Sequence, residues 1–111
     1  MSEKPLENYV KTYRRRSLLS QDELAFLLGA ECGTKVSRYE RGRRVPSLET
    51  ALAMEAIFGV SIKQIFLGKF SKVDLQVRER AKVLRQKLQS NPEKRRLLEK
   101  LASLESNQLY D

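Results

Sequence analysis

The chain has 111 residues, enough for one compact domain or for a domain of roughly 60 to 70 residues with an extension. Cys32 is the only cysteine and there is no histidine, which excludes an internal disulfide, a cysteine-rich zinc site and Ser–His or Cys–His catalysis. Lys and Arg total 22 against 14 Asp and Glu, so the net charge is +8 and a polyanion is the first partner to consider.

The first two helices are predicted from apolar periodicity and capping residues. Apolar residues recur at steps of three or four from Leu6 to Leu18, as in an amphipathic helix. Ser20 then starts a second helix, with Glu23 placed to complete a capping box, and Gly29 ends it. The apolar face of this second helix consists of Leu24, Leu27 and Leu28.

A short third helix is predicted for Thr34 to Arg41, with Gly42 as its C-cap. Val36 and Tyr39 can face inward in this helix. The residues that then face outward are Lys35, Ser37 and Arg38.

Two more helices complete the first part of the chain. Pro46 breaks the chain and Ser47 caps a fourth helix that runs through Phe58. Ser61, with Gln64 three residues later, repeats the capping pattern for a brief fifth helix. Five short helices therefore fill residues 5–68.

The composition changes beyond Gly68, where long charged side chains become frequent. A helix is predicted from Asp74 to Gln89, and Asn91 followed by Pro92 starts another. The two apolar stripes are Val77, Ala81, Leu84 and Leu88, then Leu97, Leu101 and Leu104. We therefore expect an all-α chain with a domain over residues 1–70 and a helical hairpin over 71–111, which serves dimerisation or binds a partner.

Several separated blocks of the first part resemble the lambda-repressor-like, or XRE, helix-turn-helix family in order and spacing. The blocks are Ser20 to Ala25, Leu27 to Gly29, Val36 to Gly42 and Pro46 to Thr50. The resemblance covers residues 6–67 and implies a five-helix domain whose third helix enters the major groove of DNA.

The resemblance also implies residue roles. Gln21 matches a glutamine that holds a phosphate, although a residue at this helix start can also simply face water. Gly33, Thr34 and Arg38 match positions that read bases, and an arginine can bond both O6 and N7 of guanine. Arg38 can equally be a solvated surface arginine. The complete DNA-binding set is Gln21, Gly33, Thr34, Lys35, Ser37, Arg38, Arg41, Arg43 and Arg44.

Other positions concern structure rather than DNA reading. Arg14 and Glu40 match a family pair that braces the first helix against the third. The turn between Gly29 and Val36 is one residue longer than the commonest family spacing, and Cys32 within it is expected to be a small packing residue. The aromatic residues expected in the core or at a domain interface are Tyr9, Tyr13, Phe26, Phe58, Phe66 and Phe70.

Together these observations predict a regulator that binds double-stranded DNA as a homodimer and acts as a repressor. The alternative is an antitoxin or adaptor whose hairpin captures a protein. Family members can also pair through their fourth and fifth helices. We expect no enzyme activity, no metal or cofactor and no membrane span, and the N-terminus resembles no secretory signal, so a cytoplasmic location is expected. The sequence does not indicate an effector.

Overall fold

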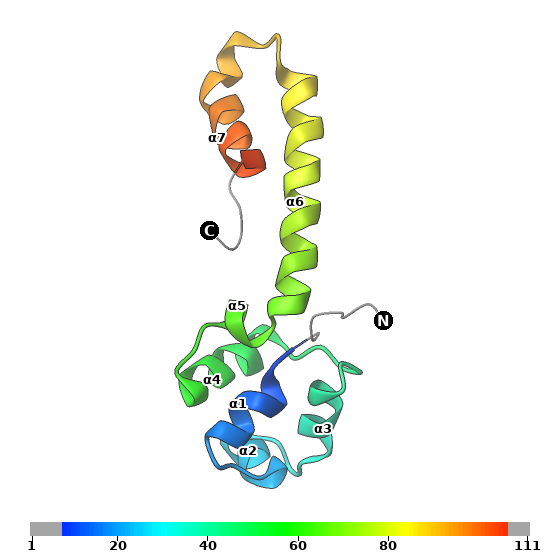
Figure 1. Ribbon diagram of the computed structural model, residues 1–111, viewed down its shortest axis with the longest axis vertical. Coiled ribbons are helices and arrows are strands. Elements are labelled where there is room, and N and C mark those ends of the chain that lie inside the picture. Colours follow the sequence, from blue (N-terminus) through cyan, green and yellow to red (C-terminus); the bar gives the residue numbers. More distant parts are fainter. Residues whose placement is uncertain (1–7, 107–111) are drawn as a thin grey trace. The chain divides into compact units, whose positions relative to one another are not determined.

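The computed structural model describes residues 8–106, and all regular structure in this range is helical, as the sequence predicts (Figure 1). The chain divides into two compact units, residues 1–69 and 70–111. No helix in the described range is both long enough and apolar enough to cross a membrane. The elements are α1 (Val10–Arg16), α2 (Gln21–Leu27), α3 (Thr34–Glu40), α4 (Leu48–Phe58), α5 (Ile62–Ile65), α6 (Leu67–Leu88), the 3-10 turn η1 (Pro92–Lys94) and α7 (Arg95–Ser106).

Helices α1 to α5 enclose a single core because each contributes at least one buried apolar side chain. The fully or almost fully buried members are Val10, Leu24, Ala25, Val36, Tyr39, Met54 and Ile65. Tyr13 and Phe58 stack at the edge of this core, with ring centroids 6.0 Å apart. Phe66 is also packed against it.

The outer face of α2 departs from the prediction. Phe26 is 81% exposed and Leu27 is half exposed, so neither belongs to the core. Ala25 takes their place beside Leu24, because α2 is only seven residues long and its buried face is correspondingly narrow. Of the two expectations for Phe26, the core or a domain interface, the core is therefore excluded.

Capping residues begin the helices where the sequence predicts. Ser20 with Glu23 and Ser61 with Gln64 both form complete capping boxes. The hydrogen bonds from the Ser20 backbone and side chain also lower the pKa of Glu23 below its ordinary value. Glu55 of α4 accepts a hydrogen bond from the N–H of Ile62 at 2.8 Å, which gives this carboxylate a role at the start of α5.

The first helix starts later than its apolar periodicity predicts. Residues 6 and 7 lie outside the described range, and Asn8 and Tyr9 are not helical. The Asn8 side chain accepts a hydrogen bond from the N–H of Val10 at 3.0 Å and donates one to the carbonyl of Tyr39 at 2.9 Å. This side chain satisfies a free N–H of α1 and ties its start to the end of α3.

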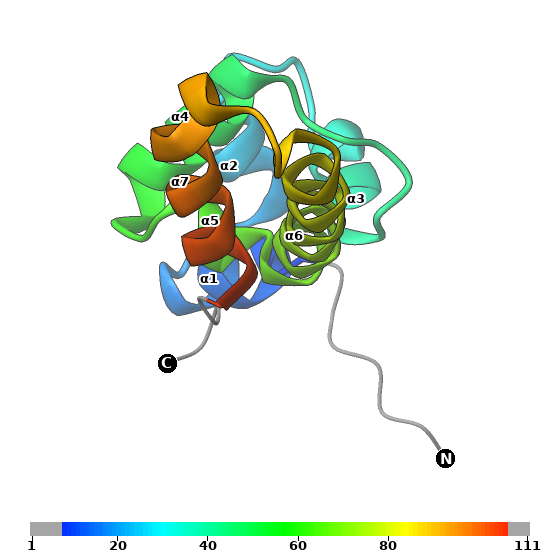
Figure 2. The same ribbon diagram turned by 90° about the horizontal axis from the view of Figure 1, so that it is seen from above.

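In the second unit, α6 and α7 lie side by side and antiparallel, as two views agree (Figures 1 and 2). Helix α6 begins at Leu67, seven residues before the predicted Asp74, and therefore includes Gly68 without a break. Pro92 follows the capping Asn91 as predicted, but the first turn there is a 3-10 turn and the α-helix begins only at Arg95.

The turn after α1 holds an unusual backbone conformation. Leu18 has a φ of 61°, the left-handed region that favours glycine. The next residue donates its N–H to the carbonyl of Arg14 at 3.1 Å, which completes a Schellman motif at the end of α1. Helices α2 and α3 end with the same motif, but there the left-handed residue is a glycine, Gly29 after α2 and Gly42 after α3. Leu18 is also 90% exposed, so its side chain contributes almost no packing.

We therefore expect Leu18→Gly to stabilise the protein by about 0.5 to 1 kcal/mol. The substitution removes the strain energy of a left-handed leucine, which is larger than the free-energy cost of the extra flexibility that glycine gives the unfolded chain. The midpoint of urea unfolding at a constant m-value measures this change. The reverse substitution, Gly29→Ala, meets no atom within 4 Å and should destabilise by a similar amount through backbone strain alone. A Leu18→Gly protein that unfolds at lower urea than the parent would contradict the prediction.

Candidate nucleic-acid interface

Helix α3 has one buried face and one exposed face. Val36 and Tyr39 point into the core, whereas Thr34, Arg38 and Arg41 are exposed. The three exposed residues are spaced by four and three positions, so they lie along one side of the helix. The burial of α3 therefore determines which of its side chains face outward.

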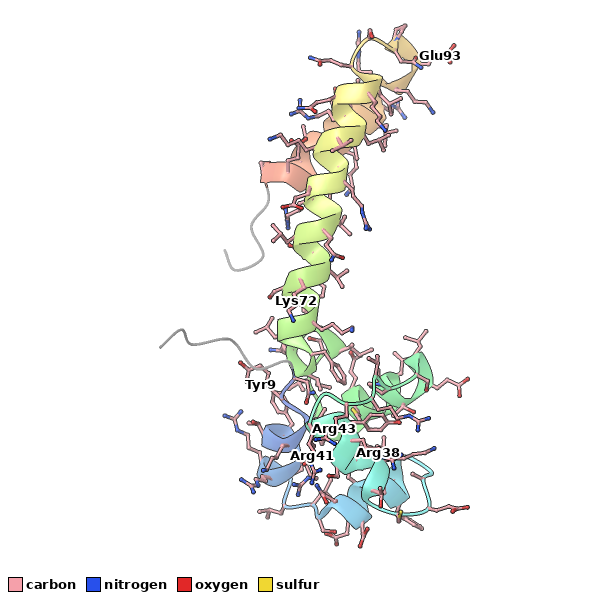
Figure 3. The ribbon with its side chains drawn as sticks, turned by 90° about the vertical axis from the view of Figure 1, so that its right-hand side faces the viewer. Tyr9, Arg38, Arg41, Arg43, Lys72 and Glu93 are labelled. Carbon is pink, nitrogen blue, oxygen red and sulfur yellow. The ribbon has the colours of Figure 1, made fainter. Side chains whose placement is uncertain are left out.

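The outward side of α3 borders an open hollow between α2, α3 and the loop that follows α3. Figure 3 shows Arg38, Arg41 and Arg43 gathered around this helix. Of the nine residues predicted to contact DNA, eight line the hollow, and Lys35 is exposed outside its lining. The lining consists of Gln21, Asp22, Cys32, Gly33, Thr34, Ser37, Arg38, Arg41, Arg43 and Arg44.

Four arginines make this hollow strongly basic. All four are exposed, and within the described range none of their guanidinium groups takes part in an ion pair. Asp22 is the single acidic residue in the lining, and its carboxylate already accepts a backbone hydrogen bond. The hollow is therefore suited to an extended anion such as a phosphate backbone.

A buried ion pair fixes α3 relative to α1 and α2. Arg14 donates from Nε to Glu40 Oε2 at 2.5 Å and from Nη1 to the carbonyl of Leu19 at 2.8 Å, which confirms the predicted brace. Glu40 Oε1 also accepts a hydrogen bond from Gln21 Nε2 at 3.1 Å. Because Gln21 lines the hollow, the same carboxylate positions a residue of the candidate interface.

Gly33 and Asp22 form a second link between α2 and α3, which the sequence did not reveal. The N–H of Gly33 donates to Asp22 Oδ1 at 2.8 Å, and Gly33 is buried at the N-cap position of α3. A Cβ at this position would lie 2.7 Å from Asp22 Oδ1 and 2.9 Å from Gln21 Cβ. Gly33 thus permits the close approach of the two helices. The sequence does show an acidic residue, Asp22, in the first turn of α2, but it does not show that the partner of Asp22 is the N–H of Gly33.

The longer turn before α3 is accommodated at the surface. Glu31 and Cys32 form an exposed bend, and α3 still begins at Thr34 as predicted. The Cys32 thiol donates a hydrogen bond to Thr34 Oγ1 at 3.3 Å. Hydrogen bonding with the side chain and backbone of Thr34 lowers the pKa of Cys32 below its ordinary value. Because Cys32 is exposed, it is not the packing residue that the sequence suggested.

We expect Gly33→Ala to destabilise the protein by about 1 to 3 kcal/mol, because the added methyl group forces α2 and α3 apart. The backbone is not the cause, since the φ of Gly33 is −68° and alanine adopts it readily. Urea unfolding measures the loss, and Glu31→Ala in the same exposed turn is the control. An alanine variant as stable as the parent would show that the two helices are loosely packed at this point.

Comparison with known families matches residues 10–65 to a family described as Helix-turn-helix, of the Cro/cI or XRE type. No curated protein and no solved structure matches the chain. The matched segment is half of the chain and contains α1 to α5, the core and the basic hollow. The chain therefore belongs to the XRE-type helix-turn-helix family of DNA-binding transcription regulators.

Proposed function

We propose that this protein is a repressor that binds a specific sequence in double-stranded DNA as a homodimer. The observation that carries the proposal is the set of four exposed guanidinium groups around α3, which form no ion pair with any residue that the structure describes. The helix-turn-helix fold by itself does not require these four arginines. Surface arginines without acidic partners can bind phosphates and base edges.

Arg38 is the residue that reads sequence in this proposal. It lies on the exposed side of α3, the helix that a helix-turn-helix unit places in the major groove. Its planar guanidinium group can donate to both O6 and N7 of guanine. Thr34 and Ser37 line the same hollow and border the bases that Arg38 reads.

The remaining basic residues hold the phosphate backbone. Arg43 and Arg44 follow α3 in the loop before α4, and Arg41 caps the end of α3. Lys35 extends the same basic surface from its exposed position on α3. Gln21 at the first position of α2 binds a phosphate with its side chain held by Glu40. These contacts supply affinity and orientation but no sequence information.

Two copies act together in this proposal because each helix-turn-helix unit reads only a short half-site. A two-fold symmetric dimer places two α3 helices one helical turn of DNA apart, and the operator is then an inverted repeat. Occupying such an operator blocks transcription from an overlapping promoter. The protein acts in the cytoplasm in this proposal.

Selection of bound sequences from random duplex DNA tests this function directly. We expect enrichment of one inverted repeat whose half-sites each contain a guanine at a fixed position. Enrichment of a single half-site would support sequence reading and contradict the dimer. A pool that stays random after several rounds would contradict sequence-specific binding altogether.

Substitution of the arginines separates base reading from phosphate binding. Arg38→Ala should cost about 1 to 3 kcal/mol on the selected operator and little on scrambled DNA, because only a base contact differs between the two. The double variant Arg43→Ala with Arg44→Ala should weaken binding to both DNAs equally. It should also flatten the slope of log affinity against log salt by about one for each phosphate that the variant no longer binds.

Competition binding at two salt concentrations measures these effects. Arg15→Ala on α1 is the matched control, since it removes one exposed positive charge that lies outside the hollow. Equal reductions in affinity on both duplexes for Arg38→Ala would assign Arg38 to the phosphate-binding residues instead.

A further inference from the structure

A second, smaller hollow lies within the first unit, between the loop that joins α3 to α4 and the first turn of α6. Its volume is about 50 Å³, and its lining consists of Asn8, Gly42, Arg44, Val45, Pro46, Phe66 and Lys69. Organic ligands and cofactors fill pockets of roughly 300 to 1,000 Å³, so this hollow admits only a single small group. Among the described residues that line it, Arg44 and Lys69 are charged, and both are cations.

Hydrogen bonds fix the two sides of this hollow relative to each other. The Asn8 side chain donates to the carbonyl of Tyr39 at the end of α3, at 2.9 Å. The next residue, Tyr9, donates its N–H to the carbonyl of Ile65 at 2.7 Å, and Ile65 is fully buried at the end of α5. The segment before α1 therefore ties the end of α3 to the end of α5. Helix α6 follows α5 directly and carries Lys69 in its first turn.

The two cations of this hollow are placed to bind an anion. Arg44 and Lys69 are exposed, and neither forms an ion pair with any residue that the structure describes. Two positive charges at one small hollow repel each other, and an anion bound between them replaces this repulsion with attraction. A guanidinium group and an ammonium group both donate strong hydrogen bonds to phosphate oxygens. The size and charge of the hollow therefore fit one phosphate group.

We infer that Arg44 and Lys69 together bind one phosphate group of the DNA backbone, so that the first turn of α6 belongs to the DNA interface. The inference rests on the proposed function, which places DNA against the larger basic hollow beside α3. Arg44 lines both hollows, so the basic surface continues from α3 through Arg44 to Lys69. Lys69 lies beyond residues 10–65, which match the helix-turn-helix family, so membership of the family does not by itself assign this contact.

The DNA affinity of the full chain tests the inference, measured for the parent, Arg44→Ala, Lys69→Ala and the double variant. Each single variant should weaken binding to operator and to scrambled duplex alike, by roughly threefold to tenfold for each bound copy, because a phosphate contact carries no sequence information. The double variant should weaken binding by less than the product of the two single effects. The reason is that the second substitution acts on a phosphate that is already poorly held.

Two control variants separate this contact from a general effect of positive charge. Arg15→Ala removes an exposed cation of α1 that lies outside both hollows, so its effect and that of Lys69→Ala should multiply without coupling. Lys69→Arg keeps the positive charge and should bind DNA within about twofold of the parent. Circular dichroism and urea unfolding show whether every variant is folded as the parent is.

Calorimetric titration with inorganic phosphate distinguishes DNA from free phosphate as the source of the group. Saturable phosphate binding that Lys69→Ala abolishes, together with full DNA affinity of that variant, would assign the hollow to free phosphate and overturn the inference. Full DNA affinity of Lys69→Ala without phosphate binding would overturn it as well, as would effects of Arg44→Ala and Lys69→Ala that multiply without coupling. In each of these cases a parent that binds its operator retains the proposed function, whereas a parent that binds no duplex contradicts both.

Discussion

The carboxylate of Glu40 is the group on which the geometry of the DNA-binding unit depends. It accepts hydrogen bonds from Arg14 of α1 and Gln21 of α2 while belonging to α3. The side chains of Arg14 and Glu40 are nearly buried, with 11% and 5% of their surface exposed, so neither ion is well hydrated and each needs the other. Such a pair adds little net stability, but removal of one partner costs about 3 to 5 kcal/mol. Its role is therefore to define where α3 lies.

The same pairing divides the arginines of the unit into two kinds. Arg14 is buried and fully engaged with Glu40 and the Leu19 carbonyl. Arg38 and Arg41, on either side of Glu40 in the sequence, are exposed and form no ion pair within residues 8–106, because the helical turn directs them away from the core. One short helix thus presents an acid to the interior and cations to the exterior. This separation leaves the outer guanidinium groups exposed at the basic hollow.

Local signals in the sequence were sufficient for most of the first unit. The capping boxes at Ser20 and Ser61 each join residues only three positions apart, so the linear sequence reveals them. The glycines at helix ends are equally recognisable, because a left-handed backbone conformation at one position favours glycine there. The hydrogen bond of Asp22 with Gly33 joins residues eleven positions apart across a turn of unusual length, and no periodicity encodes it. The early start of α6 was missed because Gly68 looks like a helix end, although the helix continues through it.

The two units differ in what holds them together. The first unit has a shared apolar core in addition to its ion pair. The second relies on two polar links across the hairpin, from Arg78 and Arg85 to α7, and on only two buried apolar residues among those that the structure describes. With so few apolar side chains buried, the described part of the hairpin depends on these polar links far more than the first unit depends on its ion pair.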